Sequence, residues 1–165
     1  MAKNIPLSTI GVKVSYAVET TAGTRPTTGY KKIHGLYSTP DFNIAPNTAD
    51  ATSFDEEDYT RKLTLLREMP DTVQFGVRFG QTFATEWEAL RSAYKTGIET
   101  AAGAKETWFC IDIKGYDKAL YFTGEPLALG IPAMEANSGI DHIAYIAPTS
   151  EPVPATKPTA YDEDN

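Results

Sequence analysis

The stretch that decides the fold reads VQFGVRFGQTFATEWEALRSAYKTG and covers residues 73–97. Apolar residues occupy every second position over 73–79, and this period of two predicts a β-strand with one buried face. Further on, Trp87, Leu90 and Tyr94 follow at spacings of three and four, which place them on one side of a helix. The stretch therefore predicts a strand followed by a helix whose apolar side lies on a sheet.

The ends of this helix have their own signals. Thr85 and Glu88 fit the capping-box pattern, in which a Thr begins the helix and a Glu three residues later bonds back to it. Gly97 is suited to end the helix, because glycine adopts the left-handed conformation common after the last turn. We therefore expect the helix over about 85–96.

Strand patterns dominate the rest of the chain. The further candidates are 12–18, 30–37, 59–66, 109–113, 119–124 and 142–147. The tetrapeptide GYDK at 115–118 predicts a hairpin turn between two of them. About seven short strands and one helix predict a mainly β fold, a β-sandwich or barrel with one flanking α-helix. Exposed edges of such a sheet can pair with other chains.

Residues 39–58, TPDFNIAPNTADATSFDEED, interrupt this pattern with two prolines, four Asp and two Glu. Connections longer than ~12–15 residues without secondary structure are uncommon in compact domains and are usually functional or disordered. Phe42, Ile44 and Phe54 are apolar anchors within this stretch. We therefore expect a long assembly loop that contacts another subunit and becomes ordered on docking.

An acidic run follows the last anchor and consists of Asp55, Glu56, Glu57 and Asp58. A solvated loop is the simplest interpretation, and the alternatives are the rim of a subunit contact and a Ca²⁺ or Mg²⁺ site. The run lacks the DxDxDG spacing that wraps calcium, so we predict no metal. We assign the acids to the rim of the contact. The candidate basic partners are Lys31, Lys32, Arg61 and Lys62.

The C-terminal residues 148–165, PTSEPVPATKPTAYDEDN, contain four prolines and few apolar side chains. They cannot bury enough surface to offset the entropy of ordering. The sequence therefore predicts a β-sandwich domain over 1–147 and a flexible, Pro-rich acidic arm over 148–165.

Composition disfavours several classes of protein. The 22 acids and 15 bases give a net charge of −7, which does not suit a protein that grips nucleic-acid phosphates. The N-terminal MAKNIPLSTIG lacks the apolar core of a signal peptide, and no apolar run approaches the ~18 residues of a membrane span. We therefore expect a protein that is made in the cytoplasm and is soluble at first.

Catalytic residues are not arranged in a recognisable pattern. His34 and His142 are the only histidines, and Cys110 is the only cysteine, placed within a predicted strand where a small buried filler is expected. The sequence has no G-x-S-x-G, no phosphate-binding glycine loop and no HExxH. Trp87 and Trp108 could form a ligand platform, but core packing is favoured. We predict no catalytic, cofactor-binding or metal site, and no enzyme activity.

Several segments occur in an order that is characteristic as a whole. They are GLYSTPDFNIAP (35–46), DATSFDEEDY (50–59), TEWEALRSAYKTG (85–97), TWFCIDIKGYDKALYFTGEP (107–126) and HIAYIAPTSEP (142–152). This order resembles the major tail tube proteins of long, non-contractile bacteriophage tails. The resemblance covers most of residues 10–150. Ala49 and Ala51 depart from it, because the family has bulkier apolar residues there.

The resemblance implies a β-sandwich or barrel whose six copies close into a ring, with inner sheets joined into a β-lined channel. Rings would stack into a tube around a tape-measure protein, and tail terminator and distal tail proteins would bind at its ends. The long loop would reach a neighbouring subunit or ring. DNA would pass through the lumen without specific binding, and an acidic wall would repel its phosphates. The protein would be assembled in the host bacterial cytoplasm, reside in the virion tail and bind no membrane by itself.

Three other functions remain open at this stage. A minor phage tail or head-tail joining protein would share most of these features. A carbohydrate-binding or adhesin-like β-sandwich module would explain the strands and aromatic residues, but not the long loop. An unrecognised hydrolase is the third alternative.

Overall fold

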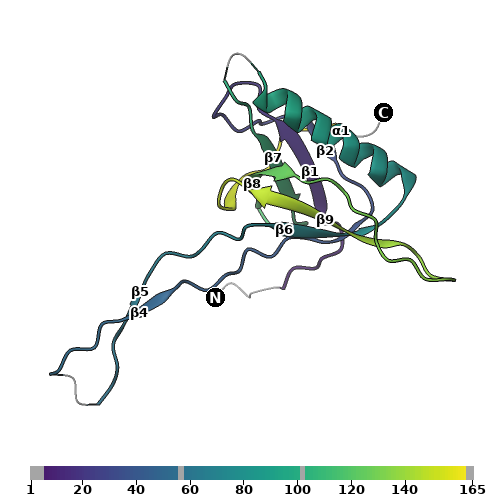
Figure 1. The fold of residues 1–165 in the computed structure, drawn as a ribbon. Helices are drawn as coiled ribbons and strands as arrows, with labels where there is room; N and C mark the ends of the chain where they lie inside the picture. Colours follow the sequence, from purple (N-terminus) through teal and green to yellow (C-terminus); the bar gives the residue numbers. More distant parts are fainter. Residues whose placement is uncertain (1–5, 56–57, 101–102, 163–165) are drawn as a thin grey trace.

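A computed structural model describes residues 6–55, 58–100 and 103–162 of the chain. A curled β-sheet and one helix form the body, and a long hairpin projects from it (Figure 1). The strands are β1 (Lys13–Val18), β2 (Tyr30–Lys32), β3 (Leu36–Ser38), β4 (Thr48–Asp50), β5 (Lys62–Thr64), β6 (Val73–Arg78), β7 (Thr107–Asp112), β8 (Lys118–Pro126), β9 (Asp141–Pro148), β10 (Val153–Thr156) and β11 (Tyr161–Asp162). The helix α1 covers Gln81–Ile98.

The strands of the body follow the spatial order β11-β2-β1-β7-β8-β9-β6-β3, and β10 lies beside β8. Strand β8 pairs with β7 along its first half and with β9 at its end, so the sheet turns a corner at this strand. The predicted fold class is therefore confirmed: the chain is mainly β, with one helix and a sheet curled into a half-barrel. The predicted strand over 73–79 is β6, and the predicted hairpin after 109–113 is β7–β8.

The core lies inside this curled sheet. Alternate strand positions and one side of the helix supply it, and its buried members are Val14, Tyr16, Ile33, Val73, Phe75, Val77, Phe83, Trp87, Leu90, Phe109, Ile111, Phe122, Ala144 and Ile146. The rings of Phe109 and Phe122 stack with centroids 5.1 Å apart. The indole Nε1 of Trp87 donates a hydrogen bond to the Leu127 carbonyl at 2.9 Å. Trp87 is thus a core residue, as predicted.

The helix begins earlier and ends later than its capping signals suggest. It starts at Gln81 with Gly80 as N-cap, and no side chain caps it. Thr85 lies inside the helix, where its Oγ1 donates to the Gln81 carbonyl at 3.0 Å. Gly97 also lies inside the helix, at a site where a Cβ would come 2.7 Å from the Lys105 carbonyl oxygen. The predicted helix over 85–96 was therefore too short at both ends. The buried apolar stripe begins at Phe83, and its burial outweighs the capping signals.

The C-terminal residues do not form the expected flexible arm. Strand β10 pairs with β8, and β11 pairs in parallel with β2 at the far side of the sheet. We name residues 153–162 the C-terminal strap. Between its two strands, Lys157 Nζ lies 2.6 Å from Asp112 Oδ1. In β11, the Tyr161 hydroxyl donates to Asp112 Oδ2 at 2.6 Å. The strap belongs to the domain because these pairings compensate for its low apolar content.

The strap covers the outer face of the sheet. A second buried cluster lies beneath it and contains Ala17, Tyr30, Cys110, Ala119 and Tyr121, with Ala155 and Tyr161 packed on top. Burial raises the pKa of the Cys110 thiol, so this group is a neutral filler, as its place within a strand predicted. Among the described residues, no helix has the length and apolar content needed to cross a membrane.

Candidate functional site

The most prominent feature outside the body is a long hairpin that contains β4 and β5, residues 44–70, which we name the hairpin arm (Figure 1). Its two strands pair antiparallel, with Ala49 opposite Leu63. The pairing continues on both sides of this register: the Leu65 amide donates to the Asn47 carbonyl at 2.6 Å, and the Ala51 amide to the Arg61 carbonyl at 2.8 Å. The predicted unstructured loop over 39–58 is therefore half of a hairpin, and residues 59–66 form its return rather than a strand of the body.

The root of the hairpin arm is fixed to the body. Phe42 is half-buried and packs on the core, with its ring centroid 5.0 Å from that of Phe122. The Asn43 amide donates to Asp41 Oδ1 at 2.8 Å, and Ile44 is half-buried. Phe42 was expected to anchor a partner subunit, and this expectation is corrected: the residue anchors the arm to its own core.

The distal part of the arm has a defined turn. The amide and the hydroxyl of Thr52 donate to Asp50 Oδ1 at 2.9 and 2.5 Å. Thr52 Oγ1 also accepts a hydrogen bond from the Arg61 amide at 3.0 Å, across the hairpin. The hydrogen bonds from Thr52 hold the pKa of the Asp50 carboxyl below its usual value. Side-chain bonds of this kind replace missing backbone pairs where the two chains separate.

At the tip of the hairpin arm, the predicted contact residues that the structure describes are exposed to solvent. Phe54 is 109% exposed, and the side chains of Asp55 and Asp58 are exposed beside it. Glu56 and Glu57, which belong to the same predicted set, lie outside the described residues. The tip therefore presents an aromatic side chain directly next to acidic groups, and none of the described residues covers Phe54.

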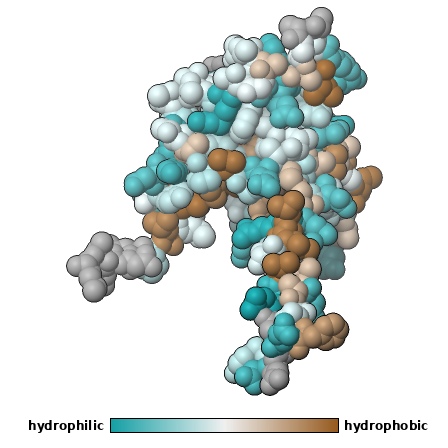
Figure 2. All heavy atoms as spheres, turned by 90° about the vertical axis from the view of Figure 1, so that its left-hand side faces the viewer, coloured by the Kyte–Doolittle hydropathy of each residue, from teal (hydrophilic) through white to brown (hydrophobic). Residues whose placement is uncertain are grey.

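The return half of the hairpin arm carries apolar side chains that the sequence interpretation did not assign to the contact. They are Tyr59, Leu63, Leu65, Leu66 and Met69, all exposed. Figure 2 shows apolar groups following one another along the arm where it leaves the body. The signal was present in the run LTLL over 63–66, which has more apolar residues than a solvated hairpin needs. Contiguous exposed apolar surface of this kind marks interaction sites.

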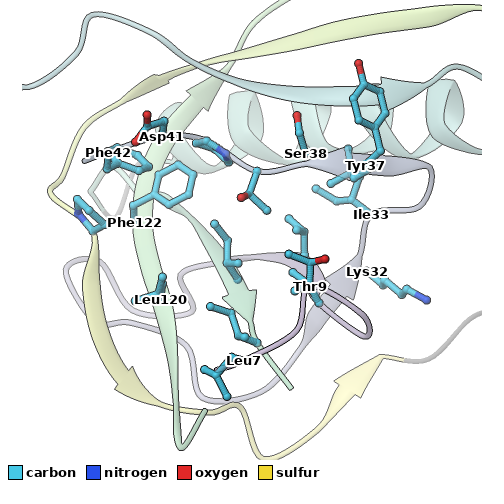
Figure 3. A pocket seen from close by; sticks show the side chains of 18 of the residues that line it. Leu7, Thr9, Lys32, Ile33, Tyr37, Ser38, Asp41, Phe42, Leu120 and Phe122 are labelled. Atoms are coloured by element: carbon cyan, nitrogen blue, oxygen red, sulfur yellow. The ribbon is translucent and has the colours of Figure 1, made fainter. Parts of the chain in front are cut away.

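A second feature is an open groove in the body, with a volume of about 950 Å³ (Figure 3). Its apolar lining comes from inner sheet positions and from the segments that flank them. These residues are Leu7, Val12, Val14, Ile33, Leu36, Phe42, Ile111, Ile113, Leu120 and Phe122. The helix α1 packs elsewhere on the inner face, through Phe83, Trp87 and Leu90, and does not line this groove. The half-barrel is thus filled at one end and open at the other.

Polar residues also line the groove, and some are already engaged. The His34 amide donates to Glu86 Oε2 at 2.8 Å, and its ring Nδ1 lies 2.5 Å from Glu86 Oε1. The ammonium of Lys32 lies at the outer edge (Figure 3). Asp41 also belongs to the lining. Such a groove, with an apolar floor and a cation at its edge, is suited to apolar groups that carry negative charge beside them.

The remaining candidates for chemistry lie apart. His142 is buried on the β9 side, with its ring nitrogens 2.7 and 2.8 Å from the Gly130 and Ile143 carbonyls. Cys110 lies under the C-terminal strap, on the other face of the sheet. Trp108 is half-buried and donates from Nε1 to Glu19 Oε1 at 2.9 Å. The structure therefore does not bring the two histidines and the cysteine together.

Among residues 6–55, 58–100 and 103–162, no group of three or more His, Cys, Asp or Glu side chains is placed to hold a metal ion.

No protein-family model matches the chain. No curated protein matches it in a search with its sequence. The function is therefore inferred from the hairpin arm, the groove and the order of segments in the sequence.

Proposed function

We propose that this protein is a structural subunit of a phage tail tube, which assembles into rings that stack around a DNA conduit. The observation that carries the proposal is the hairpin arm, with its row of exposed apolar side chains held away from the body. A lone domain gains nothing by holding Phe54, Leu65 and Leu66 in water. An assembling subunit gains about 1.5–3 kcal/mol for each such side chain that becomes buried.

The geometry of assembly follows from where the two surfaces lie. The hairpin arm and the groove are different surfaces of one chain, so a contact between them is head-to-tail rather than self-complementary. Head-to-tail contacts make closed rings when the rotation closes and open filaments when it does not. A tube of stacked rings uses both: closure within each ring and an open repeat along the tube. Six subunits per ring is the number that the resemblance to tail tube proteins implies.

The charge of the chain suits a conduit. A net charge of −7 gives each subunit a field that repels DNA phosphates. DNA would then move through the lumen without specific binding. The tape-measure, tail terminator and distal tail proteins are the partners that this function requires, and the virion tail is the place where it is carried out.

The test replaces the outer part of the hairpin arm. Residues 48–65 are exchanged for a short Gly-Ser linker, because Asn47 and Leu66 are already hydrogen-bonded across the hairpin at 3.4 Å. The expected product is a folded subunit that no longer forms rings or tubes in negative-stain images. A matched control shortens residues 131–138, an exposed connection between β8 and β9, and should assemble like the unaltered chain.

The outcomes separate the candidate functions. Tubes of normal length from the arm-replacement variant would contradict the proposal. Single rings from the unaltered chain, without tubes, would favour a head-tail joining protein. A monomer at every concentration would favour a binding module.

A further inference from the structure

The groove in the body is a candidate acceptor for the hairpin arm. Its floor is formed by core residues such as Val14, Ile111 and Phe122, which line the groove from β1, β7 and β8. The groove has a volume of about 950 Å³ and leads down to the core. Its apolar floor favours a protein segment with apolar side chains.

The chain itself carries a segment of that kind. Phe54 and Tyr59 flank the acidic run at the tip of the hairpin arm and are 109% and 87% exposed. We propose that these two aromatic side chains of one copy occupy the groove of the next copy, with Asp55 and Asp58 facing Lys32 at its edge. This inference rests on the proposed function, since it assigns the acceptor site for the same hairpin arm.

The arm of the same chain is not placed to fill the groove. Phe42 and Asn43, at the root of the arm, line the edge of the groove. From there the arm runs away from the body (Figure 1). Residues 44–55, extended at ~3.3 Å per residue, span about 40 Å, so the tip lies far from its own groove and can reach the groove of a neighbour.

Charge favours the same pairing. Asp55 and Asp58 are acidic and exposed, and Lys32 contributes positive charge at the edge of the groove. Asp41 also lies at this edge and is acidic, but its Oδ1 accepts a hydrogen bond from the Asn43 amide at 2.8 Å. Pairing of exposed charges adds little affinity. It sets the orientation of the tip, whereas the aromatic side chains supply the free energy of docking.

Disulfide trapping between two copies tests the contact. One copy carries Ser53→Cys, next to Phe54, and the other carries Thr9→Cys or Thr39→Cys. All three residues are exposed, and the two threonines line the groove. Both copies carry Cys110→Ser, so that the introduced thiols are the only ones. A disulfide needs Cα atoms within about 7 Å, so only a tip seated in the groove allows it. Ile131→Cys, at an exposed site outside the groove, is the matched control partner.

We expect mixed copies to give cross-linked dimers with the two groove positions, at least tenfold more than with Ile131→Cys. A chain with Ser53→Cys and Thr9→Cys together should give a ladder of oligomers. A ladder that ends at the size of a ring places the contact within rings, and an open ladder places it between rings; both support the proposal.

The contradicting results are distinguishable. Tubes that form normally while groove positions cross-link no better than Ile131→Cys would overturn the groove assignment and leave the proposed function standing. A mixture that shows neither tubes nor cross-linked dimers at any concentration would overturn both.

Discussion

The apolar side chains of the hairpin arm should matter for assembly and not for folding. Consider the triple variant Phe54→Ser, Tyr59→Ser and Leu66→Ser, whose three side chains are 109%, 87% and 88% exposed in the single chain. Surface substitutions of this kind change the free energy of unfolding by about 0.5 kcal/mol or less each. The thermal unfolding temperature of the subunit should therefore stay close to that of the unaltered chain.

The effect on association is much larger. If each side chain contributes about 1.5 kcal/mol on burial, the lower end of the usual range, three of them contribute about 4.5 kcal/mol per contact. Because 1.4 kcal/mol is a factor of ten, the association constant should fall by roughly a thousandfold. Sedimentation velocity over a series of protein concentrations measures this shift directly.

A matched control substitutes exposed apolar residues elsewhere. Ile131→Ser and Met134→Ser remove side chains that are 92% and 62% exposed in the connection between β8 and β9. This variant should assemble at the same concentration as the unaltered chain. The reasoning is refuted if the triple variant also assembles at that concentration, or if its unfolding temperature falls in proportion to its loss of assembly.

Three further predictions concern the body. Gly97→Ala should lower the free energy of unfolding by about 1–3 kcal/mol, because its Cβ would come 2.7 Å from the Lys105 carbonyl oxygen; urea denaturation measures this. Tyr161→Phe removes the hydrogen bond to Asp112 and should cost about 1.5–3 kcal/mol, since the acceptor is charged, and limited proteolysis should then cut the C-terminal strap first. Burial raises the pKa of Tyr30 from 10 to about 12, so the neutral form is favoured in the folded state. The stability that this group contributes is complete below pH 10 and should fall between pH 10 and 12, which alkaline denaturation measures. Tyr30→Phe should reduce this dependence of stability on pH.

Some of the structure follows directly from the sequence. The alternation over 73–79 predicts β6, and the pattern around GYDK predicts the β7–β8 hairpin, because one buried face imposes a period of two. The apolar spacing at Trp87 and Leu90 predicts α1 and its buried side. These elements are long enough for periodicity to be unambiguous.

Two other parts, the hairpin arm and the C-terminal strap, could not be predicted from the periodicity of the sequence. In the hairpin arm, β4 has three residues, and neither of its faces is buried against a sheet, so no period marks it. The C-terminal strap contains Pro154, which usually argues against a strand. Pro154 is tolerated in β10 because this strand lies at an edge of the sheet and pairs with β8 on one side. Such pairing depends on distant partners, which local sequence patterns do not report.

The candidate contact was predicted in part. The sequence pointed to residues 39–58 as the assembly segment, and Phe54 is the member of that set most exposed in the structure. The predicted role of Phe42 as a contact to a partner subunit was wrong. This residue instead fixes the root of the hairpin arm to the core of its own chain, which lets the arm project from the body. The apolar return over 63–66 was overlooked because an apolar run beside strands suggests the core, and only the fold shows that this run lies far from it.

The central claim is that this chain is an assembling subunit, and cryo-electron microscopy of the unaltered protein at high concentration tests it most directly. We predict tubes built from stacked rings of six subunits, with density for the hairpin arm of each copy in contact with a neighbour. A population of single chains at every concentration, with hairpin arms in solvent, would contradict the account.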